Sequence, residues 1–372
     1  MSRQSHESRR AGATIPSPRS ARGFGTWMRS EIAEQPHVLA RVVARESKAA
    51  GRIGEELRRR GVSFAVLAAR GSSDHAAVVG KYLVEWAAGV PVALAAPSIA
   101  TLYRTRLALS GGAVIGVSQS GRSPDVVEYL RMARRAGAVT IAVTNDARSP
   151  LAQAADETLL CHARKERSVA ATKTFTAQVA ALATLAGAWA GGRRGAVLLD
   201  GLRRAPALLR RTVASREPAR ALARHLAAAE RCVVLARGFA YPAALEAALK
   251  LKESAALAAE GASAADYLHG PVAAAGPGLA ALLMAPRGPG LASVRTIGAK
   301  LRAAGAEILV VSADAALKRS AAYSCDAAAG WIEPLSALPL AVVGQMTAYE
   351  LALLKGLDPD KPAGLRKVTE TW

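Results

Sequence analysis

Acidic and basic side chains recur at helical spacing in the segment 246–253, and their types suit proton transfer. Glu246, Lys250 and Glu253 fall on one face of an α-helix, and Lys252 points away from that face. A carboxylate beside a lysine in a cleft can move a proton between adjacent carbon atoms. The same spacing also fits a surface ladder of ion pairs, each worth about a few tenths of a kcal/mol. The residues alone leave both interpretations open.

His269 ends the same alanine-rich run, KLKESAALAAEGASAADYLHGP, which reads as helical from Lys250 onward. A histidine there could exchange protons near neutral pH. A lone histidine before Gly-Pro is, however, more often structural. The run therefore predicts a helix whose charged end and whose terminal histidine are both candidates for chemistry.

Three loops rich in hydroxyl groups each lie between an apolar run and a stretch of helical spacing. Hydroxyls and backbone N–H groups at a helix N-terminus suit a phosphate group. The loops lack the glycine patterns of a P-loop and of a dinucleotide site. A serine-rich loop that only caps a helix is the alternative, and Lys173 beside the third loop could be a solvated charge. The candidate binding residues are Ser72, Ser73, Ser118, Gln119, Ser120, Ser123, Val169 and Thr172.

The elements that must position these loops are short apolar runs separated by helices. The runs are continuous rather than alternating, which is typical of strands covered on both faces. They predict two doubly wound parallel sheets in three-layer α/β/α sandwiches, with ligands beyond the carboxyl ends of the strands. The runs cover residues 63–69, 89–96, 113–118, 139–144 and 157–161, then 232–236, 279–285 and 307–312.

The chain reads as a duplication, because ARGSSDHAA (69–77) resembles ARGFAYPAA (236–244), and each joins a strand to a helix. Low apolar content predicts that the first residues form a disordered basic tail. Helical spacing then predicts one or two lead-in helices, broken at Pro36. The expected divisions are 1–24 for the tail, 25–60 for the lead-in, 61–200 and 226–355 for the two domains, and 356–372 for a C-terminal tail.

The composition limits the kinds of binding partner that we expect. A formal net charge of +20 could attract nucleic acid, but no basic run is interleaved with aromatic residues, so we expect anionic substrates and no nucleic acid. No apolar run comes near the roughly 18 residues of a membrane span, and no signal peptide is apparent, so we expect a cytoplasmic protein with no membrane partner. The spacing of the histidines and of Cys161, Cys232 and Cys325 predicts no metal site, and the cysteines read as buried apolar residues.

Seven motifs in a fixed order resemble the double sugar isomerase (SIS) domain family. The sequence is similar to the isomerase half of glucosamine-6-phosphate synthase, and is closer to the stand-alone SIS-type glucosamine-6-phosphate deaminases. The resemblance runs from about Met28 to the C-terminus. The motifs are EIAEQP (31–36), RGSSDHA (70–76), SQSGRSPD (118–125), VAATKTF (169–175), ALKLKE (248–253), LHGPVA (268–273) and DPDKPAGLRKVT (358–369).

The resemblance implies roles for individual residues. The hydroxyl loops would hold the sugar phosphate, and Glu253 would transfer the proton between C1 and C2, with Lys250 assisting. His269 would open the sugar ring of a neighbouring subunit, which implies a homodimer with shared active sites. Lys367 matches the lysine that forms a Schiff base in the synthase. No metal or organic cofactor is expected.

The expected reaction is hydrolytic deamination of glucosamine 6-phosphate to fructose 6-phosphate and ammonia. Arg70 stands where the synthase has a cysteine, and a short basic tail stands where it has its glutaminase domain. We therefore do not expect glutamine-dependent synthesis. Two alternatives remain: an enzyme for galactosamine 6-phosphate or a fructosamine 6-phosphate conjugate, and a regulator that senses sugar phosphates.

Overall fold

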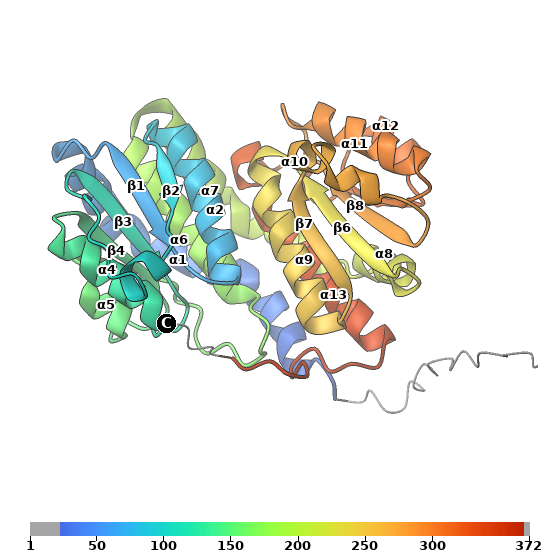
Figure 1. Cartoon of the computed structure of the whole chain (residues 1–372), viewed down its shortest axis with the longest axis horizontal. Helices are drawn as coiled ribbons and strands as arrows, with labels where there is room; N and C mark the ends of the chain where they lie inside the picture. The colour runs from blue at the N-terminus through green and yellow to red at the C-terminus, as the bar shows by residue number, and fades with distance from the viewer. Residues whose placement is uncertain (1–22, 368–372) are drawn as a thin grey trace, which may run out of the picture.

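The computed structural model describes residues 23–367, so the expectation of a disordered tail lies outside the described residues, except for its end. Two five-stranded sheets lie side by side (Figure 1), with the strand orders β2-β1-β3-β4-β5 and β10-β9-β8-β6-β7. Every strand pair is parallel. The predicted fold class is confirmed.

The strands are β1 (Phe64–Ala68), β2 (Val92–Leu94), β3 (Gly112–Val117), β4 (Val139–Thr144), β5 (Glu157–Leu160), β6 (Arg231–Ala236), β7 (Ala258–Ser263), β8 (Leu279–Met284), β9 (Glu307–Val311) and β10 (Tyr323–Cys325). The α-helices are α1 (Thr26–Arg59), α2 (Ser72–Ala88), α3 (Ser98–Thr101), α4 (Pro124–Arg135), α5 (Pro150–Ala154), α6 (Lys173–Ala190), α7 (Gly192–Ala214), α8 (Glu217–Ala227), α9 (Tyr241–Ala255), α10 (Ala264–Leu268), α11 (Leu291–Ala303), α12 (Ala315–Arg319) and α13 (Ala337–Leu354). Short 3₁₀ turns are η1 (Gly238–Ala240), η2 (Pro271–Ala274) and η3 (Glu333–Leu335).

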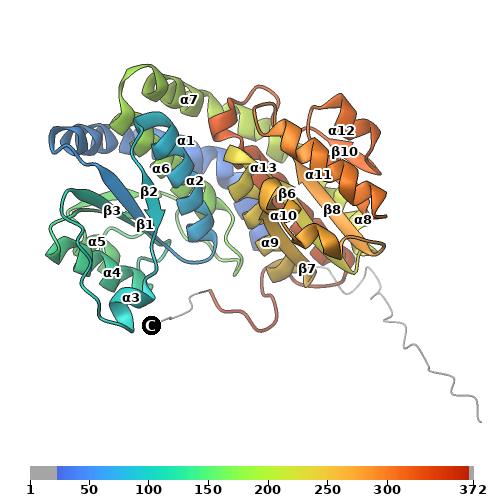
Figure 2. The same ribbon diagram turned by 45° about the horizontal axis from the view of Figure 1, so that its top comes forward.

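Helices cover both faces of each sheet. In the first domain, α4 and α5 pack on one face, and α1, α2 and α6 pack on the other. In the second domain, α10, α11 and α12 cover the outer face, and α8, α9 and α13 cover the inner one. The inner helices of both domains share a single apolar core, and Figure 2 shows α2, α9 and α13 between the two sheets. This common layer fixes the two domains against each other.

The lead-in is one helix, and the predicted break at Pro36 is wrong. Proline has no N–H to donate to the carbonyl of Ile32, which should leave that oxygen unpaired inside the helix. The side-chain amide of Gln35 donates to the Ile32 oxygen at 3.3 Å instead. The replacement hydrogen bond and the burial of Pro36 keep α1 continuous.

The alanine-rich run after Lys250 is not one helix, which corrects a second expectation. Helix α9 ends at Ala255, and Ala256 follows in the left-handed conformation, with φ = 47°. Residues 258–263 then form the edge strand β7, which pairs along its whole length with β6. The pairing with β6 overrides the low strand propensity of Ala-Ala-Glu-Gly-Ala-Ser.

One described helix is as long and as apolar as a membrane span, although the sequence analysis expected no such segment. The stretch Glu333–Leu354 is long and apolar enough by composition, but 89% of its most apolar window is buried inside the protein. A helix that is apolar on every side is typical of the centre of a large core. Cys161 and Cys232 are buried as expected, while Cys325 is only partly buried.

Candidate active site between the two domains

The first two hydroxyl loops leave the sheet at its topological switch point. After β1 the chain crosses to β2 on one side, and later returns to β3 on the other side of β1. Ala68 pairs in register with Gly116, so the loops that begin after β1 and after β3 start side by side. Ligands of doubly wound folds bind in the crevice at this point. The fold therefore brings the loops of Ser72 and Ser118 to one edge.

The loop from Ser118 to Ser123 is tightly wound. The Ser118 and Ser123 hydroxyls lie 3.2 Å apart, and the Ser120 hydroxyl accepts a hydrogen bond from the Arg122 N–H. Gly121 has φ = 62°, and a Cβ there would overlap Ser149, so only glycine fits. The carbonyl of Gln119 accepts from the backbone of Asn145 at the end of β4. Pro124 then begins α4.

An ion pair ties the loop after β1 to the start of α4. Arg70 Nε donates to Asp125 Oδ2 at 2.7 Å, and the Asp125 side chain is buried while Arg70 is half exposed. The Ser73 hydroxyl accepts from Gln178 of α6 at 2.9 Å. The cysteine that the synthase resemblance places at position 70 could not form this ion pair with Asp125.

Helix α1 and the C-terminal segment hold the third loop, which joins β5 to α6. Glu31 of α1 accepts hydrogen bonds from the backbone N–H groups of Arg167 and Ser168. The Val169 N–H donates to the carbonyl of Asp360 at 3.1 Å. The Asp360 carboxylate in turn accepts from the N–H groups of Trp27 and Met28 at the start of α1. Two segments distant in sequence, α1 and the C-terminal segment, thus fix the backbone around Val169.

Glu166, which the sequence did not single out, is the centre of that loop. Its fully buried carboxylate accepts from Lys367 Nζ at 2.8 Å, from the Thr172 N–H at 2.9 Å and from the Thr174 hydroxyl at 2.6 Å. Burial opposes ionisation, but Lys367 and these hydrogen bonds outweigh it and hold the pKa of Glu166 below its usual value. The Thr172 hydroxyl also faces Glu166.

Helix α9 presents the predicted charged face to the interior, so the surface-ladder interpretation is wrong. Lys250 and Glu246 are 0% exposed, whereas the Glu253 side chain is 25% exposed. Lys250 Nζ donates to Glu253 and lies 3.5 Å from Glu246. Burial opposes the charge of Lys250, but Glu246 and Glu253 outweigh it, and Glu166 adds to them, so the pKa of Lys250 is raised. Lys250 is therefore an ammonium group beside a partly accessible carboxylate.

Glu246 connects this helix to the first domain. Its two oxygens lie 3.1 Å from the Ser72 hydroxyl and 2.8 Å from His75 Nδ1, both at the start of α2. The network thus runs from the first hydroxyl loop through Glu246 and Lys250 to Glu253. His75 lies in a motif that the sequence marked, but its partner on α9 could be seen only in the fold.

His269 lies apart from these contacts. It ends α10, its side chain is exposed, and its N–H donates to the carbonyl of Asp266. Lys173 is neither solvated nor in the hydroxyl cluster, because its buried ammonium lies 3.0 Å from Glu34 and 3.8 Å from Glu31 of α1. Among residues 23–367 there is no group of three or more side chains suited to bind a metal ion.

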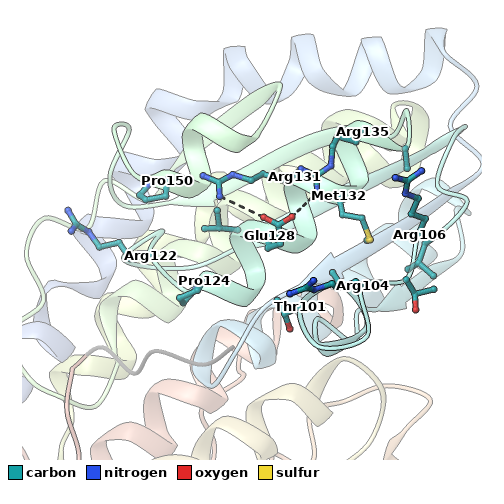
Figure 3. Close-up of a pocket in the computed structure, with 15 residues that line it drawn as sticks. Thr101, Arg104, Arg106, Arg122, Pro124, Glu128, Arg131, Met132, Arg135 and Pro150 are labelled. Carbon is teal, nitrogen blue, oxygen red and sulfur yellow. Dashed lines mark hydrogen bonds and ion pairs between the residues drawn. The ribbon is translucent and has the colours of Figure 1, made fainter.

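An arginine-lined groove of about 1190 Å³ lies beside the cluster rather than over it. It runs between α4 and the segment 100–107, with Arg122 at one end and Arg106 at the other (Figure 3). Glu128 on its floor pairs with Arg135 at 2.7 Å and with Arg131 at 3.8 Å. The carboxylate of the groove is thus paired with arginines, whereas the hydrogen-bonded cluster combines a partly accessible carboxylate with a buried lysine, so the cluster is the candidate site.

Comparison with a protein-family model finds the same unit twice in the chain. A family model described as the SIS domain matches residues 63–188 and 225–355. The chain belongs to the SIS domain family. The chain is 33% identical, over 93% of its length, to glutamine–fructose-6-phosphate aminotransferase (isomerizing) from Thermus thermophilus. The enzyme of the same name from Pyrococcus horikoshii is 31% identical. The chain spans 59% and 58% of the length of these two relatives.

Solved structures show the same double-SIS arrangement. A protein from Silicibacter pomeroyi assigned as a phosphosugar isomerase matches with a TM-score of 0.82 and 34% identity, over 90% of this chain and 100% of that one. The C-terminal domain of glucosamine-fructose-6-phosphate aminotransferase from Francisella tularensis matches with a TM-score of 0.82 and 25% identity, over 92% and 99%. Both matches extend over nearly the whole of the two solved chains, so this SIS protein shares their complete fold.

Proposed function

We propose that this SIS protein converts glucosamine 6-phosphate and water into fructose 6-phosphate and ammonia. The observation that carries the proposal is the continuous network from Ser72 through Glu246 and Lys250 to Glu253. It joins a loop suited to a phosphate to a carboxylate suited to proton transfer. Membership of the SIS family, and the likeness to a protein assigned as a phosphosugar isomerase, also support a phosphosugar substrate.

In the proposed reaction, Glu253 removes the proton from C2 of the open-chain amino aldose. The proton is returned to C1, and the C1 carbonyl oxygen gains a proton while the amine on C2 loses one, so C1 becomes CH₂OH and C2 becomes a ketimine. Water adds to C2, and ammonia leaves with the C2–N electron pair. The Lys250 ammonium stabilises the negative charge that develops on the C1 oxygen. Glu246 holds that ammonium in place.

Lys367 can contribute in two charge states. As the ammonium that pairs with Glu166 it attracts the sugar's developing negative charge. After losing a proton it can instead attack C2 of the ketimine, so that ammonia leaves and water then hydrolyses the resulting Schiff base to the ketone and free Lys367. Glu166 is positioned to accept that proton. Since burial raises the free energy of a charged carboxylate without a partner, the pair favours the ammonium state until substrate arrives.

We propose that the ring is opened by His269 of the partner subunit, since His269 of this chain is exposed and apart from the cluster. Mixing Glu253→Gln protomers with His269→Ala protomers tests this idea. A shared site predicts that the mixture regains up to about a quarter of wild-type activity, because half of the protomers enter mixed dimers and each such dimer has one intact site. No regain after demonstrated subunit exchange would exclude sharing.

The reaction itself is tested by measuring ammonia and ketose release from a panel of amino-sugar 6-phosphates, with and without glutamine. We expect equal amounts of both products from glucosamine 6-phosphate, without glutamine. Galactosamine 6-phosphate and a fructosamine 6-phosphate conjugate test the alternatives with the same proton chemistry. Exclusive turnover of either would replace our proposal, and a dependence on glutamine would indicate synthesis.

A further inference from the structure

The second SIS domain has a pocket of about 330 Å³ at the place that corresponds to the third loop of the first domain. Strands β8, β9 and β10 correspond to β3, β4 and β5 by their order in the sheet. Residues of the loops that follow these strands line the pocket, among them Arg287, Asp326 and Trp331. Its volume is within the range of sites for small molecules.

The two loops that precede the long core helices differ in how their polar groups are satisfied. In the first domain, Glu166 is paired with Lys367, and Thr172 at the start of α6 bonds to Glu166. In the second domain, Ser336 occupies the start of α13 and lines the pocket. Its side chain is 0% exposed, and its hydroxyl has no hydrogen-bond partner among residues 23–367. A buried hydroxyl in this state costs free energy.

Glu333 lies in the same pocket. Among residues 23–367, no cation pairs with Glu333 as Lys367 pairs with Glu166. Its carboxylate lies against Gly288, where φ is 156° and a Cβ would overlap it. Partial burial raises the pKa of Glu333. A glycine that makes room for a carboxylate, and a carboxylate without a counter-ion, both fit a site that receives a positively charged group from outside.

We propose that this pocket is a second ligand site, which binds an amino sugar through its ammonium group. The ammonium donates to Glu333, a ring hydroxyl bonds to Ser336, and the apolar face of the ring lies against Trp331. Two carboxylates and one guanidinium give the lining a net negative charge, which favours a cation. The proposal goes beyond the deamination reaction and does not depend on it.

Calorimetric titration of the full-length protein with glucosamine and with glucose tests the site, because the two sugars differ only in the amine. We expect glucosamine to bind about 10-fold or more tightly than glucose, since a charge-assisted hydrogen bond is lost with glucose. Glu333→Gln should abolish this preference. Ser336→Ala should weaken the binding of glucosamine about 5-fold, the effect of one neutral hydrogen bond.

Two controls keep the result specific. Glu260→Gln removes an exposed carboxylate of the same domain and should leave binding unchanged. Replacement of both Ser118 and Ser123 by Ala alters the first domain and should also leave the binding of glucosamine unchanged. The proposal is overturned if folded Glu333→Gln binds glucosamine like the wild type, if the change at Ser118 and Ser123 removes binding, or if the wild type binds neither sugar.

Discussion

The two SIS domains have sheets of matching strand order, yet different parts of each reach the candidate active site. The first domain contributes the loops at the carboxyl ends of its strands. The second contributes the side of α9, the helix that follows its first strand, and α9 packs against the corresponding helix α2. Ser72 and His75 on α2 face Glu246 on α9. In the proposed reaction the two copies of one fold have different tasks, with binding in the first and proton transfer in the second, as expected where function depends on the site rather than on the topology.

This division makes Glu253 the residue whose loss should have the largest effect. Glu253→Gln keeps the shape of the side chain but removes the base, so we expect kcat to fall by about 10²-fold to 10⁴-fold. The affinity for the sugar phosphate should stay near its wild-type value, because the first domain holds the phosphate in the proposed reaction. Steady-state kinetics with a binding titration check both. Lys252→Gln, on the exposed face of the same helix, should leave kcat unchanged.

Loss of the ion pair between Lys367 and Glu166 should give the next largest effect, in this case a decrease in the free energy of unfolding. Lys367→Met leaves a buried carboxylate without its cation, and we expect a loss of about 2 kcal/mol in the free energy of unfolding near pH 7. Since the folded-state pKa of Glu166 is lowered, the stability from the pair is present above the usual pKa of glutamate, near 4.5, and is lost as the pH falls through the lowered value. Urea unfolding at a series of pH values measures this difference. A gap between wild type and variant that stays constant down to pH 3 would contradict the assignment.

The first domain should respond in binding rather than in turnover. With both Ser118 and Ser123 changed to Ala, a phosphate would lose two hydrogen bonds, so KM should rise by about 10-fold to 100-fold. We expect kcat to change by less than about 5-fold, because these hydroxyls are proposed to bind the phosphate rather than C1 or C2. A variant with normal KM and a large loss of kcat would reverse the division between the domains.

The arginine groove should give the smallest effect. Arg104 and Arg106 line the groove, and their change to Gln removes positive charge from it without breaking the ion pairs of Glu128 with Arg131 and Arg135. We expect kcat/KM to fall by about 2-fold to 5-fold at low salt, and the difference to disappear at about 0.5 M salt. An effect that does not depend on salt would instead indicate direct contact with the substrate.

The sequence predicted those parts of the fold and site that depend on local pattern. Apolar runs placed the central strands, and the spacing of Glu246, Lys250 and Glu253 placed their common face. Strands β7 and β10 were missed, because one lacks β-branched residues and the other is only three residues long. Glu166 was missed because its neighbours, Arg164, Lys165 and Arg167, resemble a solvated charge run. Glu166 is buried by tertiary packing, which the local sequence does not show. In the same way, the hydrogen bond from Gln35 that helps α1 to continue through Pro36 is not visible in the sequence pattern.

The central claim is that Glu253 moves a proton from C2 to C1 of an amino-sugar phosphate held by the other domain. Glucosamine 6-phosphate deuterated at C2 tests it directly, with the products followed by NMR and the ammonia measured in parallel. We predict fructose 6-phosphate that carries deuterium at C1 or has exchanged it with water, a slower reaction than with the protonated sugar, and no product from Glu253→Gln. An aldose product that retains deuterium at C2, or normal ammonia release by Glu253→Gln, would contradict the account.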